Sequence, residues 1–295
     1  MRQDYVVRAV AEDALIKAFV ARTTRLCEEA RQCHDTYPTA TAALGRLLTA
    51  ACIQGMNLKG NDRLTIRIQG DGPLGQLVAV SRPNGKVKGY VSQPHVHLPL
   101  RPDGKLDVGG AIGKGMMYIS KDLGLREPYT GSVPLVSGEI AEDLTHYFAV
   151  SEQTPSVVAL GVLVDIDNSV KGAGGILVQL MPGATEDLIV KLEENIAALP
   201  AVSRYFGEGH TPEELLGLVL KGFDYRILAD QPLMFDCDCS RAKLEEILVS
   251  LGEEELRSLG EEQGGAEVRC HYCNKTYRFT RDDLVRIIRE MKERD

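Results

Sequence analysis

The sequence predicts an α+β protein in three parts: a mixed-sheet N-terminal core domain, a helical linker and a small C-terminal zinc-binding domain. Three observations lead to this prediction. Strand patterns predominate over residues 1–182 with few regular β–α–β crossovers, two short helical patterns follow over 183–231, and two close pairs of cysteines lie within 232–295. A length of 295 residues suggests about two domains and is enough to bury at least one sizeable core.

The core domain opens with a predicted strand over residues 5–10. The most regular helical pattern covers residues 39–56, where apolar side chains at helical spacing predict one buried stripe: Leu44, Leu47, Leu48, Ala51 and Cys52. Residues 64–68 alternate as in a half-buried strand. The remaining predicted elements are a hairpin with strands over 76–80 and 87–92 around a Pro-Asn-Gly turn, a helix over 140–153, and strands over 157–165 and 175–181.

The linker, residues 183–231, contains two short predicted helices. Thr185 is placed to cap the first, and Thr211 to cap the second, with a proline at its first helical position. The second helix is expected to include Gly217 and Gly222, each of which costs about 1 kcal/mol relative to alanine. Helices of this length are marginal alone in water. We therefore expect the linker to be stable only while it packs on another part of the protein.

The C-terminal part, residues 232–295, is predicted to hold two helices and a hairpin. Ser240 caps the first helix, whose expected apolar face is Leu244, Ile247, Leu248 and Leu251. Thr280 and Asp283 form a capping-box-like start for a helix over 284–291, and the hairpin strands cover 268–270 and 276–279. So few apolar residues predict a thin core, and domains of this size often need a disulfide or a metal.

Composition excludes several classes of protein. The net charge is −8, from 42 acidic and 34 basic residues, which disfavours nucleic acid and anionic membrane surfaces as partners. There is no tryptophan, and no apolar run approaches the roughly 20 residues of a membrane-spanning helix. Charged residues interrupt the N-terminal region where a signal peptide would be apolar. We therefore expect a cytoplasmic protein.

The cysteines give the sharpest prediction. Seven of them, in a reducing compartment, argue against a disulfide framework, and Cys27, Cys33 and Cys52 are expected to be small core residues. The other four form a CxC pair and a CxxC pair separated by 30 residues, a pattern typical of one zinc ion bound by four thiolates. The predicted metal ligands are Cys237, Cys239, Cys270 and Cys273.

The CxC pair also suggests a redox switch. Strand spacing puts the Cα atoms of Cys237 and Cys239 about 6.6–6.8 Å apart, so a disulfide between them would be strained and readily reduced. Thiolates are the form that oxidants attack, and oxidation to two local disulfides would remove every zinc ligand. Zinc contributes roughly 10–16 kcal/mol of folding free energy in small fingers. We therefore hypothesise that oxidation melts this domain together with the linker.

The chain resembles the bacterial 33-kDa chaperonin family of redox-regulated holdase chaperones. The cysteine signature matches in the segments FDCDCS (235–240) and CHYC (270–273), followed by Tyr277 and Phe279. The resemblance extends through the first domain and covers nearly the whole length, in the segments TATAALGR (39–46), GDGPLG (70–75), SGEIAED (137–143) and SEQTPS (151–156).

This resemblance implies a cytoplasmic, ATP-independent chaperone that binds zinc and is inactive when reduced. Peroxide with heat, or hypochlorite, would form the disulfides Cys237–Cys239 and Cys270–Cys273 and release the zinc ion. The linker would then unfold, and the protein would form a homodimer that holds thermally unfolding or oxidatively damaged client proteins against aggregation. No catalytic residue is implied, so we expect that the protein is not an enzyme.

Other motifs are set aside. Residues 70–75 satisfy the GxGxxG pattern, but a strand is expected after them where a dinucleotide site needs a helix. Residues 109–115 depart from a phosphate loop at two positions and are expected to form a flexible turn. His95 and His97, on one face of a possible strand, are expected in surface or packing roles, and His271 is expected to face solvent.

Two alternative functions remain open at this point. A zinc ribbon that binds nucleic acid or a translation complex is disfavoured by the 15 acidic and 11 basic residues of 232–295. A thiol–disulfide oxidoreductase usually places its CxxC motif at a helix start in a βαβ pattern, whereas Cys270 is expected to follow a strand.

Overall fold

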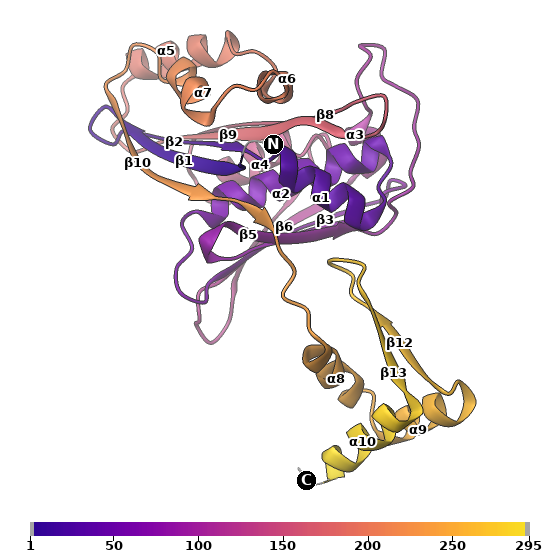
Figure 1. Ribbon diagram of the computed structural model, residues 1–295. Helices are drawn as coiled ribbons and strands as arrows, with labels where there is room; N and C mark the ends of the chain where they lie inside the picture. Colours follow the sequence, from indigo (N-terminus) through magenta and orange to yellow (C-terminus); the bar gives the residue numbers. More distant parts are fainter. Residues whose placement is uncertain (1–2, 293–295) are drawn as a thin grey trace. The chain divides into compact units, whose positions relative to one another are not determined.

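The computed structural model describes residues 3–292, which divide into two compact units (Figure 1). Unit 1 extends to Asp236 and unit 2 begins at Cys237. The fold class is α+β with mixed sheets, as predicted. The predicted division into a core (1–182), a linker (183–231) and a zinc-binding domain (232–295) concerns which segments unfold independently of the others. It stays a prediction.

Unit 1 contains two β-sheets. The first is fully antiparallel, with the strand order β10 (Tyr225–Pro232), β1 (Tyr5–Ala11), β2 (Ile16–Arg22), β9 (Val170–Leu180) and β8 (Ser156–Val164). The second has one parallel pair, β11 with β5, in the order β11 (Met234–Phe235), β5 (Lys86–Val91), β4 (Gln76–Ser81), β3 (Arg63–Gly70), β6 (Gly115–Asp122) and β7 (Tyr129–Pro134). The predicted hairpin of β4 and β5 is confirmed, with its turn at η1 (Pro83–Gly85).

Helix α2 (Pro38–Gly55) lies between the two sheets (Figure 1). The prediction of one buried stripe is wrong, because the helix contacts both sheets and is buried on all sides. Its many small residues let two sheets approach it, and Leu44, Leu47 and Leu48 are at most 1% exposed. The other helices of this unit, apart from those of 183–231, are α1 (Thr24–His34), α3 (Val108–Ile112) and α4 (Ala141–Val150).

Two local expectations are corrected here. Residues 109–115 do not form a flexible turn: they contain most of α3, which Asp107 caps by accepting a hydrogen bond from the Gly110 N–H at 2.9 Å. His95 and His97 lie in the irregular segment between β5 and α3 and not on a strand.

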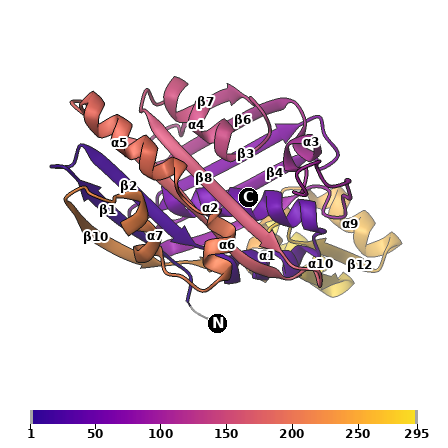
Figure 2. The same ribbon diagram turned by 90° about the horizontal axis from the view of Figure 1, so that it is seen from above.

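Three helices of residues 183–231 form a layer on the outer face of the first sheet (Figures 1 and 2). They are α5 (Glu186–Ala197), α6 (Val202–Gly207) and α7 (Pro212–Val219), and the chain then enters β10, the edge strand of that sheet. Thr211 caps α7 as predicted and also forms a capping box with Glu214, whereas Thr185 occupies the N-cap of α5 without a side-chain capping bond. The expectation that Gly222 lies inside the helix is wrong, because α7 ends at Val219 and Gly222 has a left-handed φ of +75°.

Unit 2 contains three helices and a hairpin among its described residues: α8 (Arg241–Val249), α9 (Glu253–Glu262), β12 (Gly265–Arg269), β13 (Thr276–Thr280) and α10 (Arg281–Lys292). The caps at Ser240 and at Thr280 with Asp283 are confirmed. Its core is small, with six buried side chains: Leu244, Leu248, Leu256, Phe279, Leu284 and Ile287. Ile247 and Leu251 are 55% and 50% exposed, so that part of the predicted apolar face of α8 is wrong.

Candidate metal centre

Two short segments of unit 2 bring the four cysteines together. Cys237 and Cys239 lie in the segment between β11 and α8, which has no regular secondary structure. Cys270 and Cys273 lie in the tight turn between β12 and β13. That turn is closed by the Asn274 N–H, which donates to the Cys270 carbonyl at 2.8 Å.

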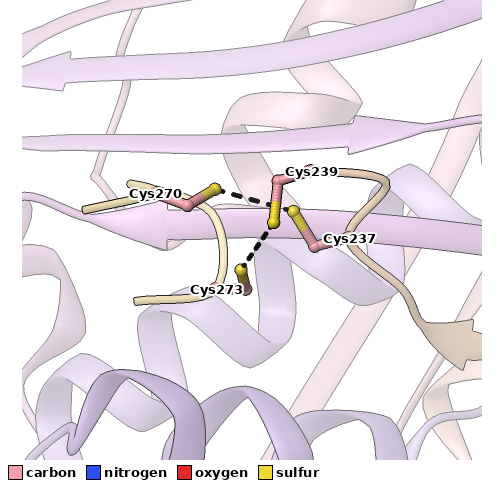
Figure 3. Close-up of side chains that lie close together, drawn as sticks. All are labelled: Cys237, Cys239, Cys270 and Cys273. Atoms are coloured by element: carbon pink, nitrogen blue, oxygen red, sulfur yellow. Dashed lines mark hydrogen bonds between the residues drawn. The ribbon is translucent and has the colours of Figure 1, made fainter. Parts of the chain in front are cut away.

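The four sulfur atoms lie within 4.8 Å of one another (Figure 3). The Sγ atoms of Cys237 and Cys270 are 3.7 Å apart, and those of Cys239 and Cys273 are 3.3 Å apart. A regular tetrahedron with metal–sulfur bonds of about 2.3 Å has sulfur–sulfur edges of about 3.8 Å. The quartet therefore fits one tetrahedral metal ion, such as zinc, with a soft four-sulfur donor set.

The site is partly shielded from solvent. Cys270 is 8% exposed, and the other three cysteines are half-buried. The Tyr277 hydroxyl lies 3.4 Å from the Cys239 sulfur and 3.3 Å from the Cys239 carbonyl oxygen, to which it donates. The sequence signature includes Tyr277, but the hydrogen bond of its hydroxyl joins residues 38 positions apart and could not be predicted from the sequence.

Without a metal ion, the thiols differ in acidity. Burial raises the pKa of Cys237 to about 11 and also raises the pKa of Cys273. Burial acts in the same direction on Cys239, but hydrogen bonds from Tyr277 and the neighbouring thiols outweigh it and hold the pKa of Cys239 below its usual value. The hydrogen bond to Cys239 raises the pKa of Tyr277 to about 12. Metal binding must therefore displace protons, since only thiolates are ligands.

The remaining cysteines are separate from this site. Cys27 and Cys52 are core residues, as predicted, and burial raises the pKa of Cys27 to about 12. Cys33 is half-buried, so its expected place in the core is wrong. No disulfide joins any of the seven cysteines, all of which lie in the described part of the chain.

The GxGxxG pattern and the histidines that the sequence analysis set aside do not form a nucleotide or metal site in the described residues. Residues 70–75 connect β3 to β4, and a strand follows them where a dinucleotide fold needs a helix. His95 pairs on the surface with Asp35, at 3.0 Å from Nε2 to the carboxylate oxygen, and packs against the Tyr37 ring. His271 is exposed, as expected.

Comparison with known proteins gives a consistent result. A sequence model of the Hsp33 protein family matches residues 4–280. The 33 kDa chaperonin of Desulforamulus reducens is 54% identical over 99% of this chain and 100% of its own length, and that of Clostridioides difficile is 50% identical over 98% and 100%. The crystal structure of the 33 kDa chaperonin of Thermotoga maritima is 38% identical, covers both chains completely and has a TM-score of 0.93.

These relatives are named chaperonins, which are not enzymes, and this agrees with the expectation of a non-catalytic protein. Between residues 3 and 292, no helix has the length and apolar character that crossing a membrane requires.

Proposed function

Because the chain belongs to the Hsp33 protein family, we propose that it is a redox-regulated, ATP-independent holdase. In this proposal it is zinc-bound and inactive when reduced, and it is activated by disulfide formation, zinc release and unfolding of residues 183–231. Its family makes it a chaperone whose partners are unfolded client proteins. We expect it to act in the cytoplasm, where its thiols start reduced.

The observation that carries the proposal is the cysteine quartet. Cys237, Cys239, Cys270 and Cys273 are the proposed ligands of one zinc ion, and the spacing of their sulfur atoms supports this. The six-residue core of unit 2 is too small to stabilise a domain strongly, so the metal would supply much of its folding free energy.

Oxidation would remove all four ligands at once. One thiolate of each pair attacks the oxygen–oxygen bond of a peroxide, which gives a sulfenic acid and water or an alcohol. The second thiolate of the pair then displaces hydroxide from that sulfur and forms the disulfide. We propose the pairs Cys237–Cys239 and Cys270–Cys273, each of which passes two electrons to one peroxide molecule and leaves no thiolate to hold the ion.

Unfolding of residues 183–231 would then expose the surface that binds clients. The layer buries apolar side chains of α5, α6 and α7 against the first sheet: Leu192, Val202, Phe206, Leu215, Leu216 and Val219. Release of the layer would expose both these side chains and the sheet face under them, and contiguous apolar surface of this kind binds unfolded chains. We expect the exposed state to form a homodimer.

The test is light scattering from a thermally aggregating client enzyme, with the chaperone either reduced and zinc-loaded or treated with peroxide at elevated temperature. Suppression of aggregation only after oxidation, with one zinc released per chain, is the expected result. Cys273→Ser should abolish the switch, and Cys33→Ser, outside the quartet, should preserve it. Equal suppression in both redox states would leave a chaperone without the proposed switch.

A further inference from the structure

The Tyr277 side chain reaches the candidate metal centre from outside the two cysteine pairs. Tyr277 lies on β13 and is half-buried, and its ring packs against the small core of unit 2. Its hydroxyl lies 3.4 Å from the Cys239 sulfur and 3.3 Å from the Cys239 carbonyl oxygen. The Lys275 ammonium lies over the ring, 5.2 Å from its centroid, and Val268 of β12 is the cross-strand partner of Tyr277. The hydroxyl is therefore held beside the sulfur by a packed ring.

Metal binding would preserve this contact and remove other hydrogen bonds of the quartet. The contacts of Cys237 with Cys270 and of Cys239 with Cys273 are hydrogen bonds between sulfur atoms. Such a bond needs a proton on one sulfur, so it is lost once all four cysteines are thiolate ligands. The Tyr277 hydroxyl carries its own proton and can still donate it.

The hydroxyl has one proton and two acceptors within reach, the sulfur and the carbonyl oxygen of Cys239. While Cys239 is a neutral thiol, the carbonyl oxygen is the better acceptor, because sulfur accepts hydrogen bonds only weakly. A thiolate carries a negative charge, and hydrogen bonds to charged acceptors are stronger than those to neutral ones. We therefore expect the hydroxyl proton to point to the sulfur when Cys239 is a metal ligand.

A hydrogen bond to a thiolate withdraws charge from the sulfur and lowers its nucleophilicity. In the metal-bound form all four cysteines are thiolates, so their reactivity differs through nucleophilicity and access and not through the fraction ionised. Attack by Cys239 on a peroxide forms a sulfur–oxygen bond, breaks the oxygen–oxygen bond and passes two electrons from sulfur to the peroxide. The departing oxygen takes up a proton from solvent and leaves as water or an alcohol. This attack should be slower with the Tyr277 donor in place than without it.

We propose that Tyr277 is a positioning residue for the redox switch, whose hydroxyl orients the Cys239 sulfur and restrains its reaction with peroxide. The restraint would keep the protein reduced at low oxidant concentrations and so set the concentration at which the switch responds. The proposal deepens the proposed function and rests on it for the oxidation step alone. Outer-shell partners of metal ligands typically change metal affinity or activity 10- to 100-fold when they are removed, so the effect should be measurable.

The test is Tyr277→Phe in the full-length, reduced and zinc-loaded chain, a change that removes the hydroxyl and keeps the ring. Differential alkylation and mass spectrometry, with free zinc present, give the initial rate at which peroxide oxidises each cysteine pair. The rate for Cys237 and Cys239 should rise about three- to tenfold, and that for Cys270 and Cys273 should not change. Zinc affinity, measured without oxygen by competition with a chromophoric chelator, should fall about tenfold.

Cobalt(II) in place of zinc gives a readout that a purely structural role would not move. Loss of the hydrogen bond raises the energy of the sulfur electrons, so the thiolate-to-cobalt charge-transfer band of Tyr277→Phe should move to longer wavelength. Placing 3-fluorotyrosine at position 277 keeps the hydroxyl and makes it a stronger donor. That protein should show the opposite changes in the band and in the oxidation rate, and it serves as the second variant if Tyr277→Phe does not fold.

The matched control is Val268→Ala, which weakens the hairpin beside Tyr277 but leaves the hydroxyl in place. It should lower the melting temperature of unit 2 without changing the charge-transfer band or either oxidation rate. Thermal unfolding of each variant checks that it is folded.

Two results would overturn the proposal. The first is an unchanged band and oxidation rate in folded Tyr277→Phe. The second is an equal acceleration in Val268→Ala, which would assign the effect to a loosened hairpin. The cobalt spectrum and the zinc affinity need no oxidant. If the unsubstituted protein keeps its zinc in peroxide, the proposed function fails, while these two measurements still test the role of Tyr277.

Discussion

Gly172 provides a direct test of what holds residues 183–231 on the sheet. This residue of β9 lies beneath α6, and a methyl group at its Cβ position would be 2.5 Å from the Gly207 nitrogen and closer still to the Ser203 carbonyl oxygen. Both obstacles are backbone atoms of α6. Because the φ of Gly172 is not positive, alanine suits its conformation and only the space is missing. In Gly172→Ala, α6 must therefore move away by about an ångström or detach.

The size of the effect follows from what α6 buries. Val202 and Phe206 are 7% and 4% exposed, and full burial of such side chains contributes about 1.5–3 kcal/mol each. Partial loss of both contacts should lower the local stability of the layer by about 3 kcal/mol. Since 1.4 kcal/mol is a factor of ten, the open population should rise about 100-fold. The reduced variant should consequently suppress client aggregation without oxidant.

Hydrogen exchange of the α6 and α7 amides in the reduced protein measures the opening, and light scattering measures the activity. The control is Gly217→Ala in α7, where a new Cβ would meet only the Tyr225 hydroxyl at 3.6 Å. That change should stabilise the helix by up to about 1 kcal/mol and slow exchange. If the α6 and α7 amides of Gly172→Ala exchange at the same rate as those of the unsubstituted protein, the close approach of α6 to Gly172 does not hold the layer on the sheet, and the reasoning is refuted.

Three further predictions use other contacts. Tyr5→Phe removes a 2.7 Å hydrogen bond from β1 to Glu213 of α7, so the layer should lose about 1 kcal/mol in thermal unfolding of the reduced protein. Burial raises the pKa of Asp4 to about 6, so the folded state binds this proton more tightly than the unfolded chain. The free energy of unfolding should therefore fall by a few kcal/mol as the pH rises from about 4 to about 6. In Asp4→Asn, the free energy of unfolding measured by urea titration should depend less on pH over this range. Chelation under reducing conditions should unfold unit 2 and leave strands β1 to β9 of unit 1 intact, as followed by circular dichroism and by exchange of the unit 1 amides.

Each of these predictions has a distinct opposing result. An unchanged melting profile in Tyr5→Phe would mean that the bond to Glu213 adds nothing to the layer. A pH profile of Asp4→Asn that parallels that of the unsubstituted chain would assign the dependence to another group. A chelated unit 2 with native exchange would show that its six-residue core suffices without metal.

The cluster of four cysteines was predictable from sequence because its members form two pairs that are each close in the chain. Their role as metal ligands stays a prediction, and the helix starts at Thr211 and Ser240 were equally local signals. Strands β2 and β10 escaped prediction for physical reasons. Strand β2 is buried on both faces and shows no alternation, and β10 pairs with β1 from more than 200 residues away. The hydrogen bond of the Tyr277 hydroxyl to Cys239 and the packing of α6 on Gly172 likewise join residues that are distant in the sequence and meet only in the folded protein.

The connection between the cysteines and the helical layer is short and covalent. Strand β10 ends at Pro232, β11 follows at once, and the Asp236 N–H donates to the Val87 carbonyl at 2.8 Å. The first proposed ligand, Cys237, is the next residue. While unit 2 is folded, β11 and Asp236 are followed directly by ordered residues. When unit 2 unfolds, β11 becomes the last ordered strand of the chain and is free to fray. Fraying that passes Pro232 reaches β10, which is held by β1 on one side and has half-exposed apolar side chains. We therefore expect exchange in oxidised protein to rise first at β11, then at β10, and only afterwards at α7.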